Sequence, residues 1–220
     1  GKENAILQEG YPRNDYLLNH TLEDVEQVKR ALHITPEDIG GRKIVLYAPT
    51  WRDNQHDSAD GYSYQLGVDF ARLRQALGEE CIILFRAHYL VANQFDFAAY
   101  EGFVWDVSQY PDINELYVVS DLLITDYSSV FFDYANLKRP ILFYMYDLAA
   151  YRDDIRGFYL DLSELPGPIV ETEEALIQAI PQALEQDAYD EKYQRFHARF
   201  NALDDGHASE RVVKRLLETK

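Results

Sequence analysis

Cysteine is nearly absent from this sequence. The 220 residues contain a single cysteine, Cys81, so the chain can form neither an internal disulfide nor a cysteine-cluster metal site. The scarcity of cysteine favours a reducing compartment as the location of the protein. Long apolar runs are also missing, because none approaches the roughly 18 residues that are needed to span a bilayer.

Positive charge is scarce as well. Lys and Arg number 21 against 38 Asp and Glu, which gives a net charge of −17. A surface of this sign argues against general nucleic-acid binding and against adhesion of the whole domain to anionic lipid. The hydrophobic share of 47% is enough for a sizeable core. The chain opens on Gly1 without an initiator methionine or a signal-peptide pattern, so we expect a piece of a longer protein.

Short continuous apolar runs alternate with helical patterns along the chain. The apolar runs predict strands at 44–49, 81–85, 103–107, 122–125 and 141–144. Helices are predicted at 22–32, 68–77, 112–119, 129–138, 173–180, 189–200 and 209–217. Thr21 and Asp24 form a predicted capping box, and Pro181 is expected to break or kink its helix. The polar segment 53–65 is expected to be an exposed loop.

This alternation indicates an α/β fold with a Rossmann-like parallel sheet and helices on both faces. In such sheets a ligand binds beyond the carboxyl ends of the strands. The residues that follow the predicted strands are therefore the candidates for a site. They are Pro49 and Thr50 after the first strand, Arg86, Ala87 and His88 after the second, and Ser128 and Ser129 after the fourth.

Ser128 and Ser129 stand at the start of a predicted helix. Serine is a preferred N-cap and needs no ligand to explain it. The functional alternative is an anion site, because the first N–H groups of a helix and nearby hydroxyls suit a phosphate. Arg86 and His88 share one side of the chain if the strand continues. Either ion pairs with carboxylates or an anionic ligand would compensate their charge.

Asp133 lies four residues after Ser129, on the same helix face. It is either a solvated helix position or an acceptor for ligand hydroxyls, as acidic residues are for ribose in nucleotide-binding folds. Arg13 lies in a turn-rich stretch, and spacing alone does not select it. The other histidines lack ligand-type spacing, so we expect no metal.

Several of these segments resemble the CDP-glycerol glycerophosphotransferase family, the teichoic acid primases and polymerases of bacterial cell-wall synthesis. The resemblance covers nearly the whole chain, and its most specific part is the Thr-Asp-Tyr-Ser-Ser block with the downstream Asp. The matching segments are Gly10-Tyr11-Pro12-Arg13-Asn14-Asp15, Tyr47-Ala48-Pro49-Thr50-Trp51-Arg52, Arg86-Ala87-His88, the run 121–134, Arg156-Gly157-Phe158-Tyr159, Asp161 and the run 165–170.

The resemblance implies that the chain is the C-terminal, donor-binding lobe of a GT-B glycosyltransferase-like enzyme. Residues 1–20 would then be a linker that enters from the missing N-terminal lobe. The expected reaction transfers glycerol phosphate from CDP-glycerol to a lipid-linked glycerol phosphate acceptor and releases CMP, without a cofactor. We expect it in the cytoplasm, at the inner face of the bacterial membrane.

The resemblance also implies roles for individual residues. The equivalents of Arg13, Pro49, Thr50, Arg86, Ala87, His88, Ser128, Ser129 and Asp133 contact CDP-glycerol. His88 is the catalytic candidate, as the group that protonates the leaving phosphate. A second essential histidine belongs to a His-Gly-Thr-Pro-like segment of the other lobe, and this sequence has none. The isolated chain is therefore expected to be inactive.

Two alternatives remain open from the sequence. One is a GT-B enzyme that uses another donor, such as CDP-ribitol or a nucleotide sugar. The other is a non-enzymatic, doubly wound regulatory or interaction domain, which would bind no nucleotide.

Overall fold

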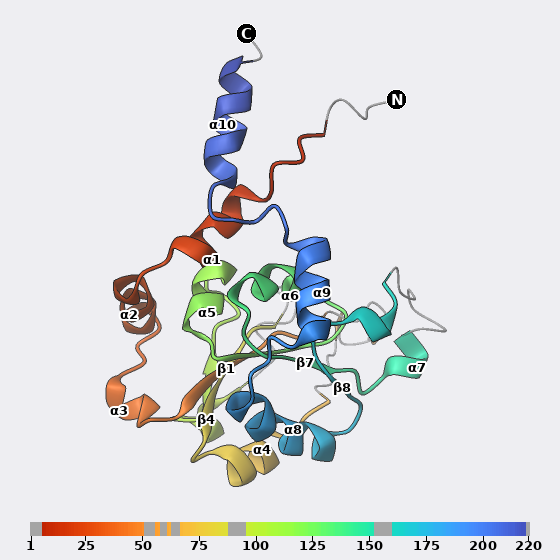
Figure 1. Cartoon of the computed structure of the whole chain (residues 1–220). Helices are drawn as coiled ribbons and strands as arrows, with labels where there is room; N and C mark the ends of the chain where they lie inside the picture. Colours follow the sequence, from red (N-terminus) through yellow and green to blue (C-terminus); the bar gives the residue numbers. More distant parts are fainter. Residues whose placement is uncertain are drawn as a thin grey trace.

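The computed structural model describes residues 6–50, 67–87, 96–151 and 160–218, and the backbone of 56–57 and 61–62 (Figure 1). Its centre is a six-stranded sheet in which every pairing is parallel. The strands are β1 (Lys43–Tyr47), β4 (Cys81–Phe85), β5 (Val104–Asp106), β6 (Leu122–Thr125), β7 (Ile141–Tyr144) and β8 (Ile169–Val170). The predicted parallel α/β class is confirmed.

The strand order is β5-β4-β1-β6-β7-β8. From β1 the chain builds outward through β4 and β5, and then returns to β6 on the other side of β1. This is the Rossmann order, and it reverses between β1 and β6. A crevice is expected at such a reversal, beyond the carboxyl ends of the two strands.

Helices cover both faces of the sheet (Figure 1). One face carries α2 (Leu22–Ala31), α5 (Ile113–Val119), α6 (Val130–Tyr134) and α9 (Glu191–Phe200), and the other carries α4 (Phe70–Leu77) and α8 (Glu173–Glu185). Alternate strand residues enter the two cores: Leu46 packs on the first side and Val45 on the second. Burying each such side chain stabilises the fold by about 1.5–3 kcal/mol.

The remaining described helices are short or peripheral. They are α1 (Asp15–Asn19), α3 (Pro36–Ile39), α7 (Leu148–Ala150) and α10 (Ala208–Glu218), with 3-10 turns η2 (Pro12–Asn14), η4 (Ala98–Tyr100), η5 (Ala135–Leu137) and η7 (Leu162–Glu164). The predicted capping box is present, because Thr21 N donates to Asp24 Oδ2 at 2.7 Å and Thr21 Oγ1 accepts from Asp24 N at 3.2 Å. None of the described helices is long and apolar enough to cross a membrane.

Residues 12–19, within the predicted linker, are ordered into η2 and α1. Leu17 and Asn14 are both buried there. This part of the N-terminal stretch therefore packs on the lobe. Its entry from a second lobe stays a prediction.

Two expectations about local structure are wrong. A break or a kink was predicted at Pro181, and the break is wrong, because the helix continues as α8 to Glu185. Pro181 removes one helical hydrogen bond, but the packing of Leu176 and Ile180 against the sheet keeps the helix in place. The predicted loop 53–65 contains two short antiparallel strands, β2 (His56–Asp57) and β3 (Gly61–Tyr62). Its other residues lie outside the described part.

Candidate anion-binding site

Hydrogen bonds join the carboxyl ends of β1 and β6, where the strand order reverses. Thr125 Oγ1 donates to the carbonyl of Ala48 at 2.8 Å. The buried carboxylate of Asp126 accepts from the backbone N–H of Thr50 at 2.8 Å and from that of Tyr127 at 2.6 Å. Pro49 and Thr50 are thereby held beside the turn that leads to the two serines. The sequence analysis did not single out Asp126, although its place directly after a buried strand was a usable signal.

Ser128 and Ser129 lie in that turn and lead into α6. Ser129 occupies the N-cap position, but its side chain makes no capping hydrogen bond and is exposed. Ser128 is half-buried, and its hydroxyl lies 3.5 Å from the N–H of Val130, at the limit for a hydrogen bond. The capping interpretation therefore explains these serines poorly, and their hydroxyls can serve a ligand.

Arg86 follows β4 and is half-buried. Its Nη1 donates to the carbonyls of Tyr110 at 2.7 Å and Val107 at 3.3 Å. Burial lowers the pKa of this guanidinium, although Tyr117 and Asp112 act in the opposite direction. No carboxylate among the described residues forms an ion pair with it. Among the described residues this partly desolvated cation is held by carbonyls alone, which favours an anionic ligand over an internal ion pair as the compensation for its charge.

The loop that holds Arg86 also holds the next residue. The N–H of Ala87 donates to Ser108 Oγ at 2.9 Å, and Ser108 N donates to Asp106 Oδ1 at 2.9 Å. Ser108 is a buried polar residue that the sequence analysis missed. The predicted catalytic residue His88 lies outside the described residues, as do 51–53 and 156–159.

Arg13 and Asp133 form an ion pair that the sequence did not predict. Arg13 Nη2 lies 2.9 Å from Asp133 Oδ2 and 3.1 Å from Oδ1. The Arg13 side chain is 60% exposed, and that of Asp133 is 14% exposed. Burial lowers the pKa of Arg13, but the hydrogen bond and the charge of Asp133 outweigh it and raise this pKa overall. Asp133 Oδ1 also accepts from Asn14 Nδ2 at 3.1 Å.

The start of α5 brings Arg13 and Arg86 to the same region. Arg86 Nη1 donates to the Tyr110 carbonyl, and Asn114 Nδ2 donates to the carbonyl of Arg13 at 2.8 Å. Asp133 links this region to α6, which begins after Ser129. The described candidates thus come from segments that meet at the carboxyl edge of the sheet.

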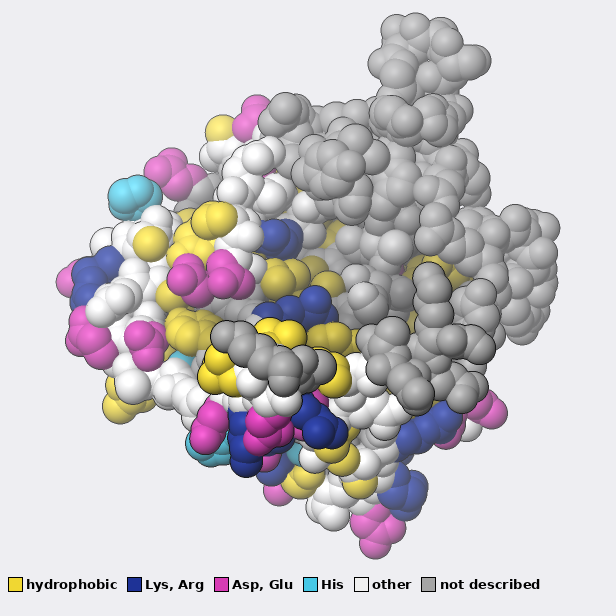
Figure 2. Space-filling model, turned by 90° about the horizontal axis from the view of Figure 1, so that it is seen from above, with side chains coloured by type: hydrophobic (Ala, Val, Ile, Leu, Met, Phe, Trp, Pro, Cys, Tyr) yellow, Lys and Arg dark blue, Asp and Glu magenta, His cyan; other side chains and the backbone are white. Residues whose placement is uncertain are grey.

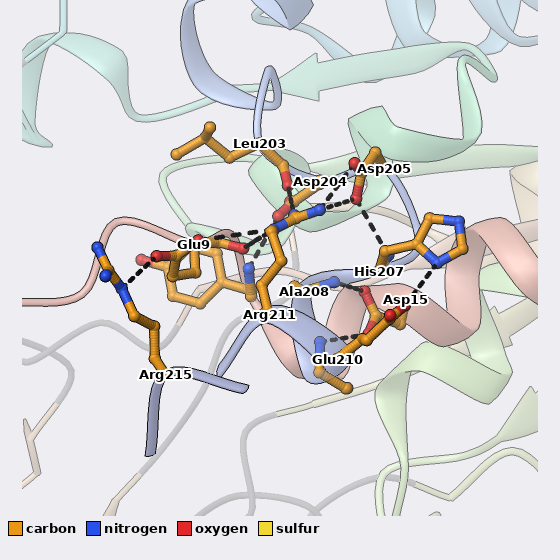
Figure 3. A network of polar contacts seen from close by, with 12 residues as sticks. Glu9, Asp15, Leu203, Asp204, Asp205, His207, Ala208, Glu210, Arg211 and Arg215 are labelled. Atoms are coloured by element: carbon orange, nitrogen blue, oxygen red, sulfur yellow. Dashed lines mark hydrogen bonds and ion pairs between the residues drawn. The ribbon is translucent and has the colours of Figure 1, made fainter. Parts of the chain in front are cut away.

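The segment that carries Arg13 is held by the C-terminal part of the chain (Figure 3). The carboxylate of Asp15 accepts from the N–H groups of Ala208 and Ser209, at 2.8 and 2.7 Å, where α10 begins. Arg211 binds the carboxylate of Asp205 at 2.7 Å and the carbonyl of Glu9 at 2.9 Å. These contacts fasten residues 9–15 at one side of the site.

Gly10 is required where this segment meets the C-terminal part. Its φ is +82°, in the left-handed region that favours glycine, and a Cβ there would collide with the carbonyl of Leu203. The N–H of the next residue, Tyr11, donates to Asp204 Oδ1 at 2.9 Å. Close approach of the two segments therefore depends on the absence of a side chain at position 10.

The fold and the site define an α/β lobe with the Rossmann strand order, in which arginines and serine hydroxyls lie near the reversal of strand order between β1 and β6. The chain belongs to the family CDP-Glycerol:Poly(glycerophosphate) glycerophosphotransferase, whose model matches residues 1–218. The family resemblance noted in the sequence is thereby confirmed.

Known relatives are polymerases and transferases of teichoic acid synthesis. The chain is 48% identical over 219 residues to a teichoic acid poly(glycerol phosphate) polymerase of Bacillus subtilis, covering 98% of this chain and 29% of the relative. It is 46% identical to a teichoic acid glycerol-phosphate transferase of Staphylococcus aureus, covering 97% of this chain and 54% of that protein.

Solved structures of the wall teichoic acid polymerase TagF share this fold. One matches with a TM-score of 0.86 at 40% identity, covering 99% of this chain and 53% of that chain. A variant of TagF soaked with CDPG matches with a TM-score of 0.83 at 39% identity, covering 99% of this chain and 51% of that one. The chain therefore spans about half the length of these structures, and less than a third of the length of the Bacillus subtilis polymerase.

Proposed function

We propose that this chain is the donor-binding lobe of an enzyme that transfers glycerol phosphate from CDP-glycerol to a lipid-linked glycerol phosphate acceptor. The observation that carries the proposal is Arg86, a half-buried guanidinium that carbonyls hold at the edge of the sheet where a ligand is expected. A diphosphate supplies the charge that such a cation lacks. Family membership and the CDPG-soaked relative support CDP-glycerol as this diphosphate.

In the proposed reaction a hydroxyl oxygen of the acceptor attacks the β-phosphorus of CDP-glycerol. The new P–O bond forms as the bond to the bridging oxygen breaks, and CMP leaves with the electron pair. Negative charge grows on the departing phosphate, so catalysis consists mainly of positioning and charge stabilisation. Arg13, Arg86 and the hydroxyls of Ser128 and Ser129 supply this stabilisation.

The protons require one group on each side of the reacting phosphorus. We assign His88 to protonate the departing phosphate, a role carried from the family resemblance. A histidine of the other lobe would accept the proton of the attacking hydroxyl. This division leaves the isolated chain without its general base.

Asp133 has a double role in this proposal. Its carboxylate holds Arg13 and Asn14, and each carboxylate oxygen can accept more than one hydrogen bond. It can therefore keep Arg13 in place and also accept from a glycerol or ribose hydroxyl. Direct contact with the diphosphate is unfavourable because the charges repel.

We place the second lobe against α10. This helix projects from the body (Figure 1), and Val213, Leu216 and Leu217 are 54%, 63% and 64% exposed. Figure 2 looks onto this side and shows hydrophobic side chains next to Lys and Arg side chains near the centre of the face. The relatives contain additional chain that can cover such a patch. Because the proposed acceptor is lipid-linked, the whole enzyme would act at the inner face of the membrane.

Calorimetric titration of the full-length enzyme tests the donor. CDP-glycerol should bind more tightly than CDP-ribitol or a nucleotide sugar, and Arg86→Ala should weaken CDP-glycerol binding about tenfold or more. Arg74→Ala is the matched control, since Arg74 also donates to a carbonyl, that of Ala99, but lies exposed on α4. Preference for another donor would favour the first alternative function. Absence of any nucleotide binding would favour the non-enzymatic domain.

A further inference from the structure

Asn114, in the first turn of α5, is a buried amide that binds the segment carrying Arg13. The residue is 5% exposed, and its Nδ2 donates to the carbonyl of Arg13 at 2.8 Å. Its own N–H donates to Asp112 Oδ1 at 2.9 Å, which fixes the turn on which it stands. The amide oxygen of Asn114 has no hydrogen-bond partner among the described residues. A buried oxygen of this kind costs free energy, so stability alone explains the residue poorly, whereas its contact with Arg13 assigns it a task.

The same turn of α5 also fixes the acceptor of the second arginine. Arg86 Nη1 donates to the carbonyl of Tyr110 at 2.7 Å. The hydroxyl of Tyr110 in turn donates to the carboxylate of Glu115, the residue directly after Asn114. Two adjacent residues of α5 therefore hold the backbone of Arg13 and the residue that binds Arg86.

Arg13 is held at both of its ends, by two different helices. Its carbonyl is bound on α5, and its guanidinium lies 2.9 Å from Asp133 Oδ2 on α6. Helix α1, which begins two residues after Arg13, lies beside α5 (Figure 1). The Arg13 side chain is long and 60% exposed, and an ion pair of an exposed side chain constrains it only weakly. The contact with Asn114 therefore fixes the backbone position from which this side chain reaches the site.

We propose that Asn114 is a positioning residue, which sets Arg13 at the spacing from Arg86 that a diphosphate ligand requires. This inference rests on the proposed function and deepens it. Two cations that contact two linked phosphates at once need a fixed separation, whereas a single phosphate can be bound by one of them. A displacement of about 1 Å that starts away from the reacting atoms can lower turnover about a hundredfold. Loss of Asn114 should therefore impair the use of a diphosphate more than the binding of a monophosphate.

The test compares Asn114→Ala with Ser120→Ala in the full-length enzyme. Asn114→Ala should lower kcat/KM for CDP-glycerol about tenfold or more, and it should raise the Kd of CDP more than that of CMP. Ser120→Ala is the matched control at the other end of α5, where the buried Ser120 hydroxyl donates to the carbonyl of Leu116 at 2.7 Å. Each variant loses one hydrogen bond of a buried side chain and should lower Tm, but Ser120→Ala should leave kcat/KM unchanged.

A double-mutant cycle shows whether Asn114 acts through Arg13. Arg13→Ala removes the side chain that Asn114 positions. In that background, Asn114→Ala should cause little further loss of kcat/KM, so the two effects should be far from additive. Full additivity would overturn the assignment.

The outcomes separate this inference from the proposed function. If Asn114→Ala keeps the kcat/KM of the wild type, or if it weakens CDP and CMP equally, the positioning role is overturned, while a weakened Arg86→Ala still supports the donor site. An equal loss of kcat/KM in Ser120→Ala would also overturn it, because any loosening of α5 would then have the same effect. If the wild type binds neither CDP-glycerol nor CDP, both proposals fall.

Discussion

Replacing the half-buried Asp204 by alanine should destabilise the lobe far more than the loss of an ordinary loop carboxylate would. Its carboxylate accepts from Tyr11 N at 2.9 Å, from Asn14 Nδ2 at 2.8 Å and from Asn136 Nδ2 at 3.1 Å. Asn14 and Asn136 are only 1% and 2% exposed. These bonds join the N-terminal segment, η5 and the loop before α10.

The expected loss follows from the two buried amides. Each keeps one acceptor, since Asn14 still donates to the Asp133 carboxylate and Asn136 to the Asp133 carbonyl. Each also retains one N–H without a partner, which costs about 1–3 kcal/mol when buried. Tyr11 is exposed, so water can replace its partner. We therefore expect a loss of about 2–6 kcal/mol, which lowers the Tm of a domain of this size by roughly 4 to 24 °C.

Thermal unfolding followed by circular dichroism measures this loss, with Asp205→Ala as the control. Asp205 is the neighbouring residue and binds Arg211 at 2.7 Å, but its side chain is 56% exposed. An exposed ion pair contributes little, so Asp205→Ala should shift Tm much less. Equal shifts for the two variants would refute the reasoning that the buried amide network carries this stability.

Three further outcomes are expected. The purified 220-residue chain should not turn over CDP-glycerol in the presence of acceptor, and measurable CMP release would contradict the assignment of the general base to another lobe. His88→Ala in the full-length enzyme should reduce kcat more than it weakens donor binding, because protonation of the leaving group helps only in the transition state; an unchanged kcat would remove His88 from the mechanism. Burial raises the pKa of Asp15, but hydrogen bonds from Ser209 and Ala208 outweigh it and lower this pKa below the usual 3.8. The free energy of unfolding of the wild type should therefore exceed that of Asp15→Asn by its full amount well above pH 3.8, and this difference should disappear as the pH falls through the lowered pKa. A difference in denaturation that does not depend on pH would argue against this role of Asp15.

Most of the secondary structure was predictable from the chain itself. Continuous apolar runs predicted β1, β4, β5, β6 and β7, and the Thr21–Asp24 capping box marked the start of α2 correctly. These signals are local, because burial on both faces and helix capping depend on residues within a few positions of each other. β8 was missed, since two residues, Ile169 and Val170, are too few to show a pattern.

The positions of the candidate site residues followed partly from the same local reasoning. A parallel sheet brings the carboxyl ends of its strands to one edge, so Thr50, Arg86 and Ser128 could be expected there. Selecting Arg13 required the family resemblance. The arginine lies far from the strand ends in sequence, and nothing in its immediate neighbourhood distinguishes it from a surface arginine.

Only the tertiary structure decided how these residues are held. The contacts of Asp204 with Tyr11 and Asn14 span 193 and 190 positions, and the Arg13–Asp133 pair spans 120. No local periodicity encodes such distances, because each partner is chosen by the packing of whole elements. The same holds for Pro181, where the burial of Leu176 and Ile180 outweighs the local helix-breaking tendency.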